Sequence, residues 1–503
     1  MARLVTHCRV DADGLRAFLV PRSDLVLEQD CGDGRYEAVE GPVRDYLRTV
    51  VATPEGDADQ YQLTQTVEFA LTVPYFWWLF QLPLRRALAR PGASAAPWWA
   101  PPARLDAVAA SVLGSLGLLA IVAGYLNTLF TQTITFAGEE FRAGDTAQGV
   151  AGAAVRIGGL VALVVASVAD RRGRRVVLVW SAAAGCALAV TGAVAPSLLW
   201  LTTSQILARA FATALALVIA IMAAEEMPAG SRAYSVSLLA MAGGLGAGVC
   251  VMSLRLADLG IRGWRLLYLV PVLALPVLVG VSRRLPESRR FTERVPEQAH
   301  VAGHGRRLWL LAAGGLLSNL FFAPQSQFAN RFLRVERGYS GGRIGLFSVI
   351  TSTPAAIGIM AGGRLADTHG RRRVGAFAIA VGTLFTVGFF FSGGWGSWVW
   401  AMAAMTVSNA SIPAFAVYGP ELFPTSLRGR ANGIVAVCAL AGSAIGLVAA
   451  GVLSDAFSSI GPAMACLAAG PALVAVLVLT LYPETARQEL EELNPGDRPR
   501  PEP

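Results

Sequence analysis

Two clusters of opposite charge occur twice in this sequence, each between long apolar runs. Asp170 precedes the arginine-rich turn Arg171–Arg175, and Asp367 precedes Gly370 and the basic run Arg371–Arg373. An arginine and a carboxylate form directional, bidentate hydrogen bonds, yet a partly hydrated pair breaks and re-forms at modest cost. Residues of these types therefore indicate a reversible tie between moving parts.

Two further motifs repeat with the same spacing. The motif from Glu225 to Arg232 is matched 196 residues later by the motif from Glu421 to Arg428, and Pro286-Glu287-Ser288 is matched 197 residues later by Pro483-Glu484-Thr485. The two aspartates of the charged clusters are also 197 residues apart. One spacing shared by three unlike motifs predicts a duplicated membrane domain with two homologous halves.

The elements that must position these charges are long apolar segments. The chain is 54% hydrophobic and only 15% charged, with a mean hydropathy of +0.52, which indicates an integral membrane protein rather than a soluble enzyme. Each predicted segment can cross a hydrocarbon core of roughly 30 Å. We expect twelve of them, approximately at 108–135, 147–169, 176–195, 197–224, 234–256, 264–282, 307–328, 343–366, 374–393, 396–419, 431–456 and 461–482.

The arginines predict the orientation. The chain has no lysine, and its arginine clusters beside the apolar segments fall mostly on one face, which the positive-inside rule assigns to the cytoplasm together with both termini. This distribution explains the net charge of +8 without nucleic-acid binding. An opposite loop argues the other way, because Arg331, Arg334, Arg337 and Arg343 would lie there, but the first face carries more arginines. The composition is typical of a GC-rich bacterial genome, so we expect an inner-membrane protein.

The domain organisation follows from these patterns. Residues 1–68 carry 13 acidic and 7 basic residues, and alternation at 43–51 and 61–69 predicts strands. The stretch after them is apolar but contains Pro74 and Pro83, which favours a helix lying on the membrane; a helix packed on the first 66 residues is the alternative. We expect a small cytoplasmic α+β extension (1–70), an interfacial segment and linker (71–104), two six-helix halves (105–282 and 307–486), a connection (283–306) and a disordered tail (487–503).

The two charged loops, the two Glu-to-Arg motifs, Gly263-Trp264-Arg265 and the Pro-Glu-Ser/Thr pair resemble signatures of the major facilitator superfamily, in particular its sugar-porter and metabolite:proton symporter branches. The resemblance covers about 105–486, with Ala166 and Thr368 departing from the usual loop residues. It implies an all-α fold of twelve transmembrane helices in two homologous halves, which rock against each other so that a central site opens to each side alternately.

The resemblance also implies a role for the duplicated charges. They would latch the two halves together at the cytoplasmic face in the outward-open state. The alternative is that they only set topology, but topology requires arginine and does not require acids at matched positions. Replacing Asp170 and Asp367 together by asparagine should then abolish transport and leave insertion intact. The latch residues are Asp170, Arg171, Gly173, Arg174, Arg175, Glu225, Glu226, Arg232, Glu287, Asp367, Gly370, Arg371, Arg372, Glu421, Arg428 and Glu484.

Inside the predicted spans, Arg209 is the charge that stands out. Burying it costs several kcal/mol unless a partner or cavity receives it, so it is a candidate for substrate or proton binding, with a tie to backbone carbonyls of the first helix as the alternative. The other substrate candidates are polar residues of the first, fourth, seventh and tenth helices, whose amides and hydroxyls suit a hydroxyl-bearing or amphipathic solute or bond a neighbouring helix. They are Asn127, Gln132, Gln205, Asn319, Gln325, Gln327, Asn409 and Tyr418.

The predicted function is transport of a small organic solute, a sugar or an organic acid, by a monomer without a cofactor. Proton-coupled relatives commonly carry an acid in the first helix, where this chain has Asn127, so coupling would fall to Glu139 or Glu140. A drug or metabolite exporter of the same fold and a non-transporting sensor that uses residues 1–104 are the alternatives. An enzyme is the weakest hypothesis, because neither a catalytic constellation nor a metal-binding cysteine spacing occurs.

Overall fold

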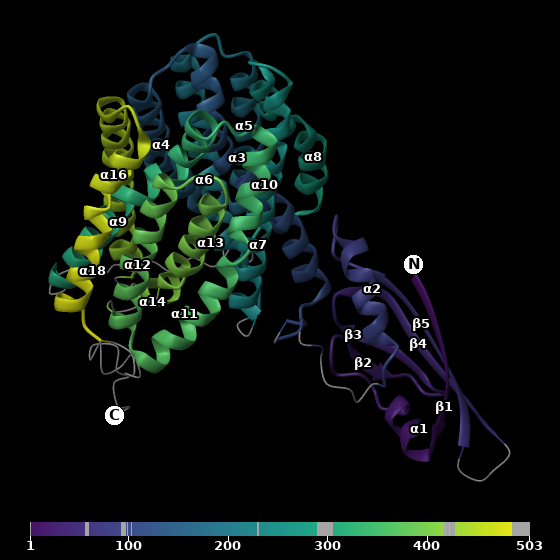
Figure 1. The fold of residues 1–503 in the computed structure, drawn as a ribbon. Helices are drawn as coiled ribbons and strands as arrows, with labels where there is room; N and C mark the ends of the chain where they lie inside the picture. The colour runs from purple at the N-terminus through teal and green to yellow at the C-terminus, as the bar shows by residue number, and fades with distance from the viewer. Residues whose placement is uncertain are drawn as a thin grey trace, which may run out of the picture.

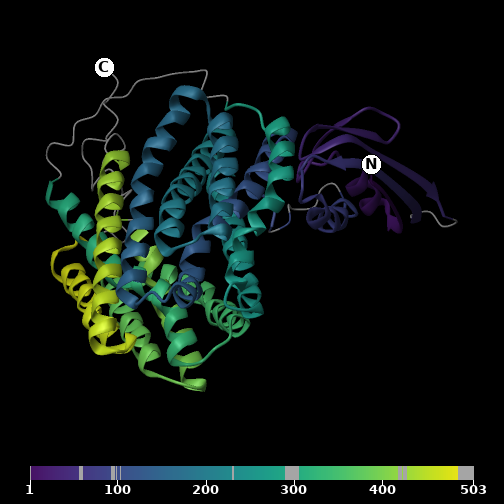
Figure 2. The ribbon, with the colours of Figure 1, turned by 90° about the horizontal axis from the view of Figure 1, so that it is seen from above.

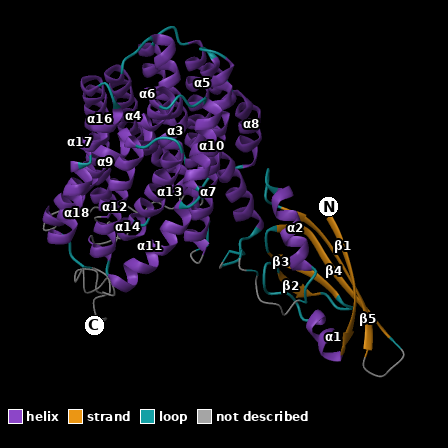
Figure 3. Cartoon of the chain, viewed as in Figure 1, coloured by secondary structure: helices purple, strands orange, loops and turns teal. Residues whose placement is uncertain are grey.

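The computed structural model describes residues 2–55, 60–91, 97, 99–101, 103–228, 231–288, 305–416, 418, 422 and 428–484. A sheet-containing module and a bundle of long helices form two parts of the chain (Figures 1 and 3). The module lies to one side of the bundle in both ribbon views (Figures 1 and 2). The predicted tail at 487–503 and most of the connection between the halves lie outside the described residues.

The module is a five-stranded antiparallel sheet in the order β1-β5-β4-β3-β2. The predicted strands and the predicted α+β extension are confirmed, and along β5 the residues Leu63, Val67 and Phe69 alternate inward as the sequence pattern requires. The helix α1 (Ala12–Leu19) follows the first strand, with Asp11 as its N-cap. The strands are β1 (Ala2–Asp11), β2 (Leu27–Asp30), β3 (Arg35–Glu40), β4 (Val43–Pro54) and β5 (Gln60–Leu71).

The helix α2 (Trp77–Leu88) combines both expectations for the segment after the sheet. Its Leu84 and Leu88 are buried in the core of the module, while Trp77 and Trp78 on the other face are exposed. The buried Arg22 donates to the carbonyl oxygens of Leu88 and Arg90 at 3.1 and 2.7 Å, which ties the end of α2 to the module. The sheet and α2 therefore form one unit with an exposed apolar face.

The bundle contains two consecutive sets of segments. Eleven helices within the described residues are long and apolar enough to cross a membrane, and the predicted segment 396–419 appears as two shorter helices with a partly described end. The first set is α3 (Ala107–Phe141), α4 (Asp145–Arg172), α5 (Arg174–Val190), α6 (Leu198–Glu226), α7 (Arg232–Met252) with η3 (Ser253–Leu259), and η4 (Gly263–Tyr268) to α8 (Leu275–Arg284). The second set is α9 (Gly305–Arg331), α10 (Gly341–Ser352) with α11 (Ala355–His369), α12 (Arg371–Phe391), α13 (Trp395–Asn409) with α14 (Ser411–Ala416), α16 (Arg428–Phe457), and α17 (Ile460–Leu467) with α18 (Ala469–Leu481).

Candidate functional site

The repeated charged loops form matching turns at one end of the bundle, which we call the motif face. Gly173 separates α4 from α5, and Gly370 separates α11 from α12, with φ angles of 98° and 96°. A Cβ atom at these positions would lie 2.4 Å from a carboxylate oxygen of Glu287 and 2.7 Å from one of Glu484. Both the backbone angle and the close approach therefore require glycine.

Each of these carboxylates accepts hydrogen bonds from the first backbone N–H groups of a helix. Glu287 Oε1 accepts from the backbone N–H of Arg174 at 2.6 Å and of Arg175 at 3.2 Å. Glu484 accepts from the equivalent N–H groups of α12, at 2.9 and 3.3 Å. These N–H groups lack partners within their own helix, and the helix dipole favours a negative charge there. Each Pro-Glu-Ser/Thr motif thus caps the helix that follows the charged loop of its own half.

The first-half latch residues also pair through their side chains. The Arg174 guanidinium contacts both oxygens of Glu225 at 3.2 Å, and Ser288 Oγ donates to the same carboxylate at 2.6 Å. Glu226 is buried beside it, Arg171 is exposed, and Arg232 donates to the Met227 carbonyl. Glu421 and the side chains of Asp170, Asp367 and Arg428 lie outside the described residues. A latch between the two halves therefore remains a prediction.

The two halves contact each other at the opposite end, which we call the far face. Asp455 of α16 accepts from the backbone N–H of Asp145 at 3.1 Å and of Thr146 at 2.9 Å, at the start of α4. Asp258 of η3 accepts from the first N–H groups of α10, at 2.6 and 2.8 Å. Asp258 and Asp455 are 197 residues apart, the spacing of the repeated motifs. The two capping contacts are therefore equivalent, and each half caps a helix of the other.

The helix backbones meet beside these caps. A Cβ atom on Gly149 of α4 would lie 2.3 Å from the Leu447 carbonyl oxygen of α16, and one on Gly345 of α10 would lie 2.7 Å from the Val251 carbonyl oxygen of α7. Glycine is needed at both places because the opposing backbone occupies the position of a side chain. The far face is therefore closed by two equivalent helix pairs.

Ion pairs complete the closure of the far face. Arg331 contacts the buried Asp145 carboxylate at 2.5 Å, and Arg334 contacts Glu139 at 3.0 Å. The sequence predicted these two arginines in a loop that opposes the positive-inside pattern, but the structure places them in the last turns of a helical span that continues to Glu336. Since each pairs with a carboxylate of the other half, the structure gives them a role unrelated to topology. Glu140 instead pairs with Arg265 within the first half at 2.9 Å.

Arg209 lies between α6 and α3. Its Nη1 donates to the Asn127 carbonyl oxygen at 2.6 Å, and Thr213 Oγ1 donates to Asn127 Oδ1 at 3.1 Å. The sequence left two roles open for Arg209, substrate or proton binding and a structural tie to the first helix. The hydrogen bond to the Asn127 carbonyl oxygen is such a tie. This bond holds one nitrogen of the guanidinium, and the other N–H groups can still donate to a bound solute.

A second intramembrane arginine, Arg156 of α4, was missed in the sequence analysis. It lies close enough to Arg209 for the two positive charges to repel each other, and its Nη2 lies 3.3 Å from Ser326 Oγ of the second half. Among the described residues, neither guanidinium forms an ion pair with a carboxylate. The criterion that selected Arg209, an ionisable residue inside a predicted span, would have identified Arg156 as well.

Of the other substrate candidates, Asn127 contacts Arg209, and Gln205 lies one turn before Arg209 on α6. Gln132 accepts from Asn330, and Gln327 donates to the Gln148 carbonyl, so both join the halves near the far face. The remaining candidates bond or pack within their own half. Asn319 bonds Gly315 and Ser443, Asn409 bonds Met405, Gln205 bonds Ser204, Gln325 is half-buried on α9, and Tyr418 packs against Tyr482.

Comparison with solved structures gives the fold. The inward-open xylose transporter XylE from E. coli aligns with a TM-score of 0.63 at 17% identity, covering 76% of this chain and 99% of that one. The nucleoside transporter NupG (D323A mutant) aligns with a TM-score of 0.63 at 13% identity, covering 74% and 100%. An inward-facing bacterial homolog of the human lysosomal transporter Spinster aligns with a TM-score of 0.58 at 15% identity, covering 74% and 95%.

Sequence comparison gives the family. A search of curated protein sequences finds no significant match. The family model of the Major Facilitator Superfamily matches residues 116–418 and 328–501, which is most of the chain. The predicted twelve-helix fold in two halves is confirmed, and the chain is a multi-pass membrane protein of a solute-transporter family. This chain belongs to the major facilitator superfamily.

Proposed function

We propose that this chain transports a small organic anion by alternating access. The observation that carries the proposal is the pair of intramembrane arginines, Arg156 and Arg209, whose described hydrogen bonds go to a hydroxyl and a carbonyl oxygen and which form no ion pair with a described carboxylate. Both side chains are partly buried, and a charge inside a membrane protein that no counter-ion neutralises is costly. An anionic solute would remove this cost when it binds, which favours the organic-acid class over the neutral sugar.

Arg156 and Arg209 are placed where binding of an anion could be coupled to the movement of the two halves. A guanidinium recognises a carboxylate or phosphate through two parallel N–H···O bonds, and the contact between Arg209 and Asn127 orients that fork. Arg156 belongs to the first half and touches Ser326 of the second. An anion bound here would therefore contact groups whose separation changes when the halves rock.

Orientation is part of the proposal. We assign the motif face to the cytoplasm of a bacterial inner membrane, because most of the arginine clusters lie there. Arg331 and Arg334, the main exceptions, are bound to Asp145 and Glu139. The closed far face would then be the outer one, and this state would open toward the cytoplasm.

The test is uptake into proteoliposomes of the purified protein, with dicarboxylates, sugar phosphates, neutral sugars and cationic dyes, with and without a pH gradient. We expect uptake of an anion that Arg156→Gln and Arg209→Gln each lower at least roughly tenfold, the equivalent of about 1.4 kcal/mol, with partial recovery in the lysine variants. Arg16→Gln, an exposed arginine of the module, is the matched control.

The other outcomes separate the alternatives. Uptake of a neutral sugar that survives loss of both arginines would contradict the anion proposal and favour the sugar porter. Dye movement against proton entry would favour the exporter. A collapse in the yield of folded Arg209→Ala protein, with the Arg156 variants fully active, would reduce Arg209 to a structural tie. Acceleration of anion uptake by an inward proton gradient would add proton coupling.

A further inference from the structure

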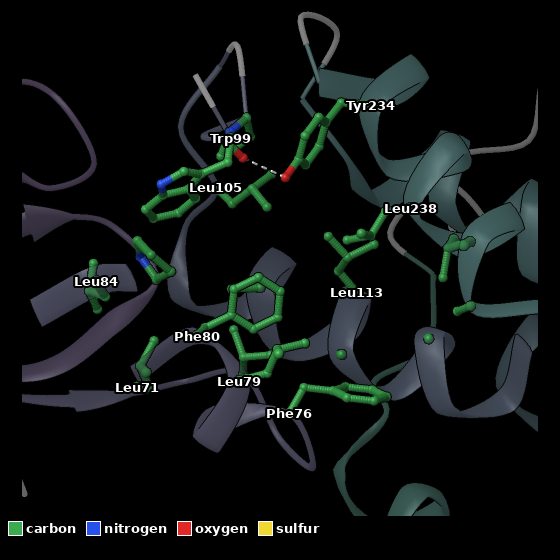
Figure 4. A pocket seen from close by; sticks show the side chains of 18 of the residues that line it. Leu71, Phe76, Leu79, Phe80, Leu84, Trp99, Leu105, Leu113, Tyr234 and Leu238 are labelled. Atoms are coloured by element: carbon green, nitrogen blue, oxygen red, sulfur yellow. Dashed lines mark hydrogen bonds between the residues drawn. The ribbon is translucent and has the colours of Figure 1, made fainter. Parts of the chain in front are cut away.

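An apolar cavity of about 190 Å³ lies between the module and the helices α3 and α7. Figure 4 shows Phe76 and Phe80 facing Leu113 of α3 and Leu238 of α7 across it. At one end, the Tyr234 hydroxyl donates to the Trp99 carbonyl oxygen at 2.9 Å. The cavity is therefore lined mainly by hydrocarbon and aromatic side chains, with Asp24, Arg104 and Tyr234 as the polar residues of its wall.

The cavity is continuous with surfaces that face the bilayer. Met241 and Leu245 of α7 form part of its wall and are 64% and 62% exposed, on a helix long and apolar enough to span a membrane. On the module side, Trp77, Trp78 and Leu82 are exposed on α2. Amphipathic helices with exposed tryptophans lie at the boundary of headgroups and acyl chains. Hydrocarbon from the bilayer thus has a direct entry.

The length of the cavity wall matches one leaflet. The wall residues of α7 run from Tyr234 to Leu245, a rise of roughly 16 Å at 1.5 Å per residue. Half of a hydrocarbon core of roughly 30 Å is about 15 Å. The end near Tyr234 lies beside the start of α7 at the motif face. Arg104 lines the cavity, and its neighbour Ala103 donates its backbone N–H to Ser231 Oγ at the start of α7, which places Arg104 at this end. The cavity therefore has the orientation of a phospholipid in that leaflet, with its polar end at the membrane surface and its apolar end toward the middle of the bilayer.

We propose that this cavity is a binding site for one phospholipid of the leaflet at the motif face, with an acyl chain between α2, α3 and α7 and the phosphate near Arg104. The Arg104 side chain donates to the Ser23 carbonyl oxygen at 2.8 Å and lies 3.9 Å from Glu40, so it is anchored to the module while remaining part of the wall. The bound lipid would fill the space between the module and the bundle and join them.

The test uses the full chain in proteoliposomes that contain a phospholipid with a photoactivatable diazirine near the end of one acyl chain. After irradiation, adducts are mapped by peptide mass spectrometry. We expect adducts on Phe76, Phe80 and residues 238–245, in addition to general labelling of exposed residues such as Leu473 and Val476 of α18.

Two variants of α7 make the test specific. Ala242→Trp places a large side chain in the cavity wall and should remove the adducts on Phe76 and Phe80, with those on Trp78 and α18 unchanged. Val236→Trp is the matched control, because Val236 is exposed on the same helix and outside the cavity wall. Absence of wild-type adducts on Phe76 and Phe80, their persistence in Ala242→Trp, or their displacement by a transported solute would each overturn the proposal.

Discussion

Asp258 and Asp455 hold equivalent places in the two halves, and each puts its carboxylate on the first N–H groups of a helix in the other half. The far face is therefore closed by two copies of one contact, related by the internal duplication. Because each copy joins a carboxylate to a helix N-terminus, separation of the halves exposes both groups to water without leaving a buried charge. Such a contact can open and close repeatedly.

We predict that Asp258→Asn combined with Asp455→Asn shifts the protein toward a state with an open far face. Each charge at a helix N-terminus contributes about 0.3–1 kcal/mol, up to ~2 kcal/mol when partly buried. The measurement is the labelling rate of Gln148→Cys, which lies buried under the contact, by a membrane-impermeant maleimide in a background without the native cysteines. Asp13→Asn in the module is the control; equal rates in the double variant and the control would contradict the gating role.

A second prediction concerns the close approach of Gly149 to the Leu447 carbonyl oxygen. A leucine at position 149 has no space while α4 and α16 remain in contact, so Gly149→Leu should hold the far face open and abolish net transport. Solute binding from the far side should persist, measured by equilibrium binding to the purified protein. Gly244→Leu, where a Cβ meets nothing within 4 Å, should transport normally. Full transport by Gly149→Leu would show that the halves close elsewhere.

The third prediction concerns the turn at Gly173. Its φ of 98° belongs to a region that side chains avoid at a cost of roughly 1–3 kcal/mol, and an added Cβ would also displace Glu287 from the start of α5. Gly173→Ala should therefore lower the thermal unfolding temperature in detergent. Gly244→Ala, within the helix α7 and free of neighbours, should raise it slightly, because alanine favours helix. An unchanged or raised unfolding temperature of Gly173→Ala would contradict the strained turn.

The sequence predicted the duplication and the fold because three motifs share one spacing, and the family match confirms both. It did not identify Asp258 and Asp455, although they share that spacing, since a single aspartate near the end of a helical segment carries no motif. Only the geometry shows that each reaches a helix of the other half. The substrate candidates such as Tyr418 lie on helices apolar on every side, where sequence periodicity does not tell which face meets the centre.

The last prediction separates the module from the transport function. Glu28 is buried with Arg48 at 2.6 Å and accepts from the Tyr46 hydroxyl at 2.6 Å. Glu28→Gln leaves the Arg48 charge buried without its counter-ion, a change that costs about 3–5 kcal/mol. The core of the module and the main core of the bundle are separate clusters. We therefore expect the module to unfold at a lower temperature while the bundle transition stays in place.

Uptake by the same Glu28→Gln protein then distinguishes two roles for the module. Unchanged uptake with an unfolded module would assign the mechanism to the two helical halves and leave sensing or assembly to residues 1–104. A parallel loss of uptake and of the bundle transition would contradict the separation of the cores. The control is Glu68→Gln, because Glu68 forms a largely exposed pair with Arg3, and exposed pairs contribute at most about 1 kcal/mol.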